Sequence, residues 1–507
     1  MEFLLFLFVI PILFFLIRKH RKNGLLMSPK LPGPPRLPVI GNLHQLDTSA
    51  LHCYLYQLSQ KYGPLMSLQL GFTPVLVVSS AKMAQQVLKT HDRIFSGRPP
   101  SFGGQKISRN GLDLTFAPYG DYWREMRKIC MLHLFSSKRV QSFRSIRKDE
   151  VSQMIENISK LGLECKLANL SEIMLSVTSA IICRIAFGRR YDDEGCGRTK
   201  FQNLLHDVQA VAAGFFFSDY FPYTAWVDRI TGLSNWAEET CKELDLFLQE
   251  AIDEHLDHGN RGEGDQEDFT HVLLQLQNDP SFSIDLSLDH IKAVLTDIFV
   301  AGTDTSAAVV VWAMTELMRN PGVMNKLQEE VRNTIGEKGG TIIEENDLEN
   351  LTYLKAVSKE IMRLHPPAPL MVPHETTQKC NVAGYEIQPK TVVYVNAWAV
   401  GRDPECWKNP EEFFPERFVG SSIDFYGQDF EFIPFGAGRR GCPGIHLGVV
   451  MVELALANLV YHFNWQLPDG MKKEDINVEV KPGITMHKKN ELCLVAKNYS
   501  GQVLRHG

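Results

Sequence analysis

The feature that most constrains this chain of 507 residues is a glycine-rich loop with a single cysteine, placed directly before a long apolar segment. The loop reads FGAGRRGCPG over residues 435–444, and the apolar segment extends from Ile445 to Phe463. Because proline is favoured at the first position of a helix, Pro443 predicts that the loop brings Cys442 to a helix N-terminus. The free N–H groups and the dipole at that end favour a thiolate. The glycines allow the backbone to approach a flat or bulky group.

A buried structural cysteine is the simpler interpretation of any one Cys. The complete pattern is more specific, because F-x-x-G-x-R-x-C-x-G fixes Phe435, Gly438, Arg440, Cys442 and Gly444. One thiolate with amide donors, a nearby arginine and no second cysteine suits an axial ligand of haem iron. At these residues the chain resembles the cytochrome P-450 family, the haem-thiolate monooxygenases.

The resemblance implies a mainly α domain with a smaller β portion, which binds haem b through Cys442. Phe435, Gly438, Arg440 and Gly444 would contact the cofactor. The thiolate would push electron density towards bound oxygen and favour O–O cleavage.

Composition excludes several other classes of protein. The net charge of −6 gives no general attraction to nucleic acid. The ten cysteines contain no C-x-x-C pair, so zinc-ribbon and thioredoxin-like sites are excluded, and a reducing compartment is the simpler interpretation.

The N-terminus predicts a membrane anchor. Residues 3–17 are almost wholly apolar and precede the basic cluster RKHRK at 18–22. This run is short for a spanning helix, which needs about 20 residues, so a cleaved signal peptide is the alternative. Glu2 and the lack of a small-x-small site favour an anchor with a cytosolic body. We therefore expect an anchor at 1–17, a basic and proline-rich linker at 18–38 and a catalytic domain at 39–507, located at the endoplasmic reticulum membrane as in the microsomal enzymes that the chain resembles.

The longest helical pattern runs from Ser287 to Asn320 and stops at Pro321. Its centre, AGTDTS at 301–306, is unusual because glycine and hydroxyl residues weaken a helix interior. One interpretation is a close helix crossing at Gly302. The other is a groove for a diatomic ligand, which matches the oxygen-activation pattern of the family. The resemblance then gives Asp304 and Thr305 the role of delivering protons.

A second helix is predicted around residues 122–128. Trp123 and Arg127 lie four residues apart and share one face, which indicates either a surface ion-pair helix or a carboxylate-binding face. The resemblance favours binding of a haem propionate by Trp123, Arg127, His374 and Arg440. Four further cations suit either docking of an acidic electron donor or a solvated face; these are Arg124, Lys128, Lys138 and Arg139.

Glu360 and Arg363 form an E-x-x-R pair, one helical turn apart. The resemblance joins them to Arg417 in a buried structural ion network. The proline-rich segment 366–373 cannot be helical. Apolar residues at positions that line the substrate pocket in the family are Leu112, Ile298, Ala301, Leu370, Val372 and Ile484.

Other segments predict the remaining elements. Strands are expected at 65–70, 75–78, 382–387, 391–396, 476–480 and 492–496, and a helix at 81–90. Residues 103–118 are expected to be irregular, and 259–268 an exposed loop. The aromatic segment 210–226 suits either core packing or the lid of a substrate channel that dips into a membrane.

The anchor, the proline hinge and runs such as NAWAVGRD at 396–403 resemble plant A-type enzymes of specialised metabolism, most of all the aldoxime-oxidising subfamily and its relatives. The expected function is insertion of one oxygen atom of O2 into a small apolar substrate, with electrons from NADPH through a reductase because the chain has no dinucleotide motif. Two alternatives are a dehydrating or rearranging enzyme of the same fold, for example one that converts aldoximes, and a haem sensor without turnover.

Overall fold

The computed structural model describes residues 30–191, 196–257, 267–277, 279, 282–336 and 342–499. The predicted anchor at 1–17 and the linker up to residue 29 lie outside these residues, as does most of the predicted loop at 259–268.

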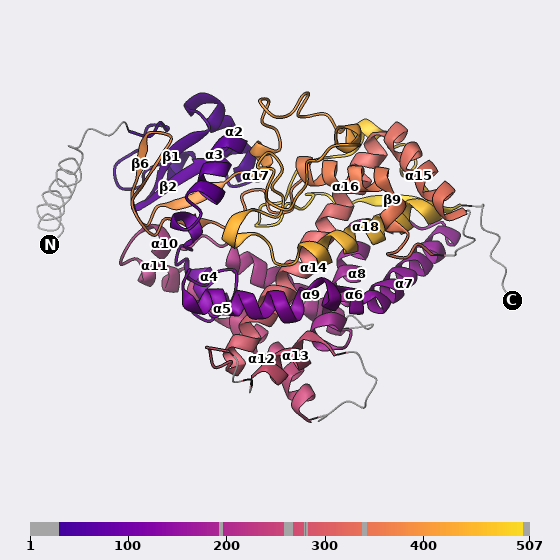
Figure 1. Cartoon of the computed structure of the whole chain (residues 1–507), viewed down its shortest axis with the longest axis horizontal. Helices are drawn as coiled ribbons and strands as arrows, with labels where there is room; N and C mark the ends of the chain where they lie inside the picture. Colours follow the sequence, from indigo (N-terminus) through magenta and orange to yellow (C-terminus); the bar gives the residue numbers. More distant parts are fainter. Residues whose placement is uncertain are drawn as a thin grey trace, which may run out of the picture.

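Helices make up most of the described fold, and strands gather mainly at one side (Figure 1). The helices are α2 Leu51–Tyr62, α3 Ala81–Gln85, α4 Phe102–Ile107, α5 Asp121–Ile129, α6 Ser137–Ser142, α7 Arg144–Leu163, α8 Leu170–Phe187, α9 Cys196–Ala212, α10 Phe217–Tyr220, α11 Ala225–Ile230, α12 Leu233–Asp257, α13 Phe269–Leu276, α14 Leu288–Arg319, α15 Pro321–Gly336, α16 Thr352–Leu364, α17 Ala397–Val400 and α18 Ile445–His462.

The strands form three small sheets. The largest has the order β1-β2-β7-β4, in which β2 and β7 are parallel and the other pairs antiparallel. A second has the order β3-β9-β8, and β5 pairs with β6 alone. Their bounds are β1 Leu65–Leu70, β2 Thr73–Val78, β3 Ala168–Asn169, β4 His374–Glu375, β5 Cys380–Val382, β6 Tyr385–Ile387, β7 Val392–Val395, β8 Phe463–Gln466 and β9 Cys493–Asn498.

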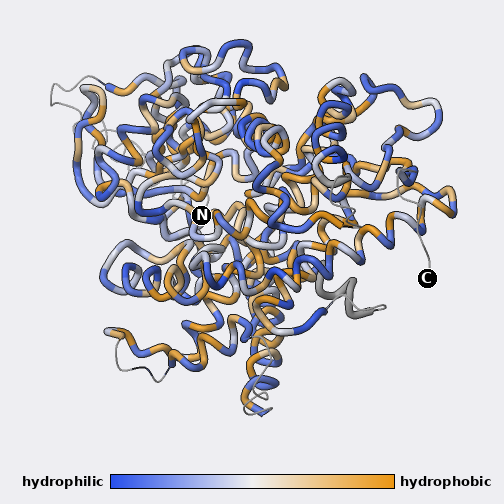
Figure 2. The backbone as a smooth tube through the Cα atoms, turned by 45° about the vertical axis from the view of Figure 1, so that its right-hand side comes forward, coloured by the Kyte–Doolittle hydropathy of each residue, from blue (hydrophilic) through white to orange (hydrophobic). Residues whose placement is uncertain are grey.

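The central helix α14 organises the core. It packs against α8, α18 and α16, and most of its residues are buried. Apolar stretches run through the middle of the fold, whereas several of the outer loops are hydrophilic (Figure 2). By length and composition α8, α14 and α18 could cross a membrane, but about 70% of each apolar window is buried inside the fold. We therefore assign these three described helices to the protein core.

The bounds of α14 confirm the prediction for 287–320. Ser287 caps the helix together with His290, and Asn320 closes it. Pro321 is the first residue of α15, where its missing N–H costs nothing. The predictions for 65–70, 75–78, 81–90, 391–396 and 492–496 are also confirmed, with residues 86–90 forming a π-helical turn.

Three predictions are wrong. Residues 382–387 form a hairpin rather than one strand, because Ala383 and Gly384 both have positive φ and make a two-residue turn. Residues 476–480 form no strand, since Val480 makes only one isolated bridge, to Lys488. The segment 103–118, expected to be irregular, begins inside α4, Phe102–Ile107, and is irregular only from residue 108 onward.

Candidate active site

Tight packing of the loop 435–444 fixes the position of Cys442. The Cys442 N–H donates to the Phe435 carbonyl oxygen at 2.8 Å. Gly438 has a φ of +68°, and a Cβ there would lie 2.3 Å from the Leu88 carbonyl oxygen, so only glycine fits. Helix α18 begins at Ile445 with Gly444 as its N-cap, two residues later than Pro443 predicts.

The electrostatics around Cys442 differ from the expectation for a helix N-terminus. Burial is the largest effect and raises the pKa of the thiol. The Gly444 N–H and the charge of Arg127 lower this pKa and offset burial only in part. These effects of the protein favour the thiol, and the charge of a bound metal ion would favour the thiolate.

We infer an internal cavity between Cys442 and the middle of α14 from the surface that both keep uncovered inside the fold. Although surrounded by protein, Cys442 keeps part of its surface free of contact. On α14, Ala301 is exposed and Thr305 half-buried, although most of the helix is buried. The Thr305 hydroxyl donates to the Ala301 carbonyl oxygen at 2.8 Å. Ala301 and Thr305 thus share the face of α14 that borders the cavity.

Gly302 and Asp304 do not lie on the face of α14 that borders the cavity. A Cβ on Gly302 would lie 2.6 Å from the Ile182 Cδ1 of α8, so this glycine permits a close helix crossing, as the first interpretation states. The Asp304 side chain is buried, and its Oδ1 lies 2.8 Å from the His487 Nε2. The Asp304 Oδ2 has no hydrogen-bond partner among the described residues.

The residues predicted to bind propionates are brought together. The Arg440 guanidinium lies 4.3 Å from the centre of the Trp123 ring, and Arg127 lies 5.4 Å from it. These side chains donate to carbonyl oxygens: Trp123 to Leu114 at 3.0 Å, Arg127 to Gly441 at 2.6 Å, and Arg440 to Ser96, Leu114 and Ala117.

His374 and a residue that the sequence prediction missed complete this cluster. The His374 Nδ1 lies 2.7 Å from the Phe95 carbonyl oxygen. Burial, followed by the charges of Arg98 and Arg440, lowers the pKa of His374 to about 3, so this histidine is neutral. The buried Arg98 donates to the carbonyl oxygens of Thr115, Val372 and Pro373. Only its position before two prolines in SGRPP, at 96–100, could have signalled it.

Arg98, Arg127 and Arg440 thus lie together, and none of them has an ion pair with a carboxylate of the described residues. The carboxyl groups that act on this cluster belong to Asp113 and Asp297, and burial raises the pKa of both, that of Asp297 to about 6. A group with two carboxylates, placed beside a cavity that a thiol borders, would satisfy these cations. The residues present therefore fit a haem with its propionates.

The predicted pocket residues divide into two sets. Leu112, Leu370, Val372 and Ile484 are half-buried, and Ala301 is exposed to the cavity. Ile298 is 5% exposed and lies in the main core, and Leu370 also packs against the cluster beneath β1 and β2.

The structure places Glu360, Arg363 and Arg417 in one network. Arg363 donates to both Glu360 oxygens at 2.7 and 2.9 Å, and the Arg417 Nε donates to the Glu360 Oε1 at 3.0 Å. The side chains of Glu360 and Arg363 are fully buried. Arg363 also donates to the carbonyl oxygens of Gly401, Pro410 and Glu412, so the network ties α16 to residues 401–417.

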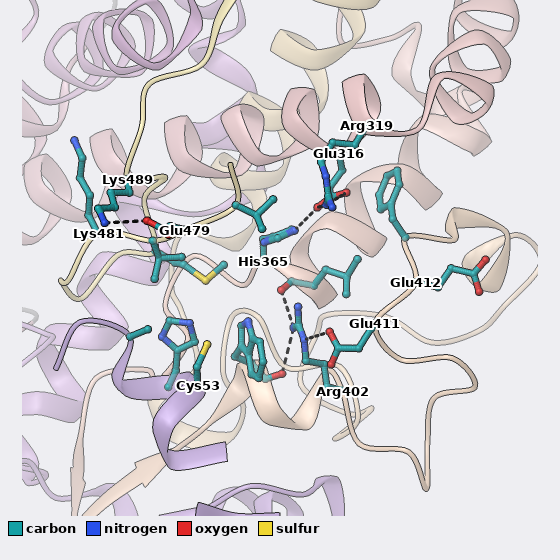
Figure 3. Close-up of a pocket in the computed structure, with 18 of the residues that line it drawn as sticks. Cys53, Glu316, Arg319, His365, Arg402, Glu411, Glu412, Glu479, Lys481 and Lys489 are labelled. Atoms are coloured by element: carbon teal, nitrogen blue, oxygen red, sulfur yellow. Dashed lines mark hydrogen bonds and ion pairs between the residues drawn. The ribbon is translucent and has the colours of Figure 1, made fainter. Parts of the chain in front are cut away.

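A separate cavity of about 1120 Å³ opens between α2, the end of α14 and residues 473–489 (Figure 3). None of the predicted site residues lines it. Several charged groups in its wall form ion pairs: His365 with Glu316, Arg319 with Glu316, Arg402 with Glu411 and Lys489 with Glu479. This cavity is therefore distinct from the Cys442 site.

Known proteins share both the sequence and the fold. Relatives in plants include 6,7,8-trihydroxycoumarin synthase of Pastinaca sativa, 48% identical with 96% of each chain covered, and strychnine-11-hydroxylase of Strychnos nux-vomica, 46% identical with 95% of this chain and 94% of that one covered. A zebra fish cytochrome P-450 solved with abiraterone has the same fold, with a TM-score of 0.74 at 24% identity over 89% of this chain and 99% of that one. The sequence model of the cytochrome P-450 family matches residues 31–495, so this chain belongs to that family and is a haem-thiolate monooxygenase of the plant A-type.

Proposed function

We propose that this enzyme inserts one oxygen atom of O2 into a small apolar substrate, at the endoplasmic reticulum membrane of a plant cell, with electrons from NADPH through NADPH–cytochrome P-450 reductase. The balanced reaction is RH + O2 + NADPH + H⁺ → ROH + H2O + NADP⁺. The observation that carries the proposal is the surface that Cys442, Ala301 and Thr305 keep uncovered inside the fold. Arg127, which contacts the carbonyl oxygen of Gly441, belongs to the cation cluster with Arg98 and Arg440.

The residues have separate roles in this proposal. Cys442 holds the iron, and bound haem supplies the binding and activation of oxygen. Trp123, Arg127, His374 and Arg440 would bind the propionates together with Arg98. The Phe435 ring and the backbone at Gly438 and Gly444 would shape the loop that carries Cys442. The Thr305 hydroxyl, on the cavity face of α14, holds a proton near the oxygen site, and Asp304 supplies it. Glu360, Arg363 and Arg417 maintain the scaffold.

A basic hollow supports docking of the reductase on the α5 side. This hollow, of about 320 Å³, is lined by Arg124, Arg127, Lys128 and Arg439. Arg127 also contacts the carbonyl group that precedes Cys442. Electrons delivered here would enter next to the iron ligand, and the positive charge would attract an acidic donor. Of the other predicted cations, Arg139 pairs with Glu267 and does not line the hollow.

An exposed apolar patch supports the membrane orientation. Val39, Phe72, Tyr223, Trp226 and Ile230 are between 46% and 97% exposed. Phe72 donates its N–H to the Tyr220 carbonyl oxygen at 2.8 Å, which joins the β1–β2 turn to α10. These elements lie on the side of the fold where the described chain begins (Figure 1). The predicted anchor at 1–17 would hold this patch against the bilayer.

The half-buried apolar side chains of Leu112, Leu370, Val372 and Ile484 suit an apolar substrate. The names of the relatives mention coumarin, xanthotoxin and strychnine, so we infer a fused-ring substrate. The test uses microsomes with the full-length enzyme and reductase, isotopically heavy O2, and a panel of these three compounds, a terpene and an aldoxime. A product that carries one heavy oxygen atom supports the proposal. Conversion of the aldoxime to a nitrile without oxygen uptake would support the dehydrating alternative instead.

A further inference from the structure

The partner of Asp304 lies outside every motif that predicted the site. The His487 Nε2 lies 2.8 Å from the Asp304 Oδ1, and the two residues are 183 positions apart in the chain. The Asp304 side chain is only 5% exposed, whereas that of His487 is 34% exposed. The pair thus connects the interior of α14 with the protein surface.

Several hydrogen bonds hold His487 in place on a turn at residues 481–487. The Trp312 indole of α14 donates to the Met486 carbonyl oxygen at 2.7 Å, and the Met486 N–H donates to Pro367 at 2.9 Å. The Lys481 N–H donates to the His487 carbonyl oxygen at 2.9 Å. Lys488 points away, towards Asn477 and the Trp312 ring. The turn is therefore tied to α14 on one side and to the segment after α16 on the other.

The second carboxylate oxygen of Asp304 is available for chemistry. It is buried and has no hydrogen-bond partner among the described residues. Such an oxygen is rare in a protein interior and indicates either an ordered water or a group that exchanges protons. Asp304 immediately precedes Thr305, which faces the cavity. A proton accepted at Oδ1 could thus leave through Oδ2 by way of a water.

We propose that His487 is the residue that takes up protons from solvent and passes them to Asp304; this inference rests on the proposed function, in which Asp304 supplies Thr305. Protonated His487 gives its Nε2 proton to the Asp304 carboxylate, which yields neutral imidazole and a neutral carboxylic acid. Asp304 then releases the proton towards Thr305 and returns to the carboxylate, while solvent reprotonates the exposed imidazole. Histidine suits this task because its charge changes near neutral pH.

The test compares His487→Gln with His487→Ala, Asp304→Asn and a control, His271→Gln. Glutamine still donates a hydrogen bond to Asp304 but cannot release a proton at neutral pH. His271 is a matched control, because it is 28% exposed and pairs with the carboxylate of Glu267. NADPH oxidation, peroxide formation and the solvent isotope effect are measured in reconstituted enzyme with coumarin as the probe and without added substrate.

We expect His487→Gln and His487→Ala to lower the proton-dependent rate about tenfold and to enlarge the solvent isotope effect, as Asp304→Asn does, while His271→Gln matches the wild type. Wild-type behaviour of His487→Gln with a defect only in His487→Ala would overturn the proposal, because the residue would then merely position Asp304. If both His487 variants behave like the wild type while Asp304→Asn is defective, the role of His487 is overturned and the proposed function stays intact.

A second readout does not depend on turnover. In the diamagnetic carbon-monoxide complex, the ¹⁵N signals of the His487 ring, assigned by their loss in His487→Gln, should shift in Asp304→Asn, because the ring then loses its carboxylate partner. His487 signals that are unchanged by the Asp304 substitution would contradict the proposal. Wild-type behaviour of Asp304→Asn and Thr305→Ala in all turnover measurements would instead refute the proposed roles of both residues.

Discussion

The Arg127 Nη2 lies 2.6 Å from the carbonyl oxygen of Gly441, the residue immediately before Cys442. Arg127 comes from α5 and is 314 positions away in the chain. Its charge lowers the pKa of the Cys442 thiol against the larger effect of burial. One side chain thus links the cation cluster to the loop that carries the iron ligand.

Replacing Arg127 by leucine should weaken haem binding about tenfold or more, because a hydrogen bond to a charged group contributes about 1.5–3 kcal/mol. Arg127→Lys should bind haem with intermediate affinity, since lysine keeps the positive charge but lacks the planar guanidinium group. The measurement is the ratio of haem to protein after purification, with Arg124→Leu as control because Arg124 is an exposed partner of Asp121 on the same helix. Equal haem contents in all variants would contradict this role of Arg127.

Thr305→Ala should divert reducing equivalents from product to peroxide several-fold, because the hydroxyl on the cavity face is lost. Thr315→Ala is a close control, since its hydroxyl makes the same kind of bond, to the Val311 carbonyl oxygen at 2.7 Å, but is fully buried. The measurement is peroxide formed per NADPH consumed. An equal effect of both substitutions would show that only the shape of α14 matters.

Glu360→Gln should destabilise the protein by about 3–5 kcal/mol, because it leaves the fully buried Arg363 without a counter-charge. Glu411→Gln provides the comparison, since Glu411 also pairs with an arginine but is 65% exposed and should cost under about 1 kcal/mol. Chemical denaturation followed by fluorescence measures the free energy of unfolding. Similar values for the two variants would contradict a structural role for the Glu360 network.

Acid should destabilise the protein through His52. Burial, followed by the charges of Arg402 and His365, lowers the pKa of His52 to about 4 from its ordinary value of 6.5. The unfolded state then binds a proton that the folded state does not, so stability is lost as pH falls from about 6.5 to about 4. At pH 5 this effect lowers the free energy of unfolding by about 2 kcal/mol. His52→Gln should remove that part of the acid sensitivity, which is measured as the free energy of unfolding at several pH values. The same pH dependence in His52→Gln and the wild type would refute the role of His52.

The features that a local sequence pattern determines could be predicted from the sequence. The Cys442 loop was recognised because glycine, arginine and cysteine stand at fixed spacings, and the limits of α14 followed from Ser287 and Pro321. Arg98 was missed because its importance comes from Thr115 and Val372, which only the fold brings beside it. The partner of Asp304 was missed for the same reason.

The bounds of the helices were also predicted more accurately than those of the strands. The hairpin at 380–387 depends on two residues with positive φ, one of them Ala383, a residue type that gives no signal for such a turn. Residues 476–480 alternate apolar and polar side chains, which suggests a strand. A strand needs a partner, however, and Val480 pairs only with Lys488.

The most direct test of the account is the carbon-monoxide difference spectrum of the reduced, purified enzyme. We predict the long-wavelength absorption band that a thiolate ligand of haem iron produces, and its loss in Cys442→Ala. A protein that carries no porphyrin, or a wild-type spectrum with only the band of a haem bound through a neutral ligand, would contradict the assignment of Cys442 as the axial thiolate.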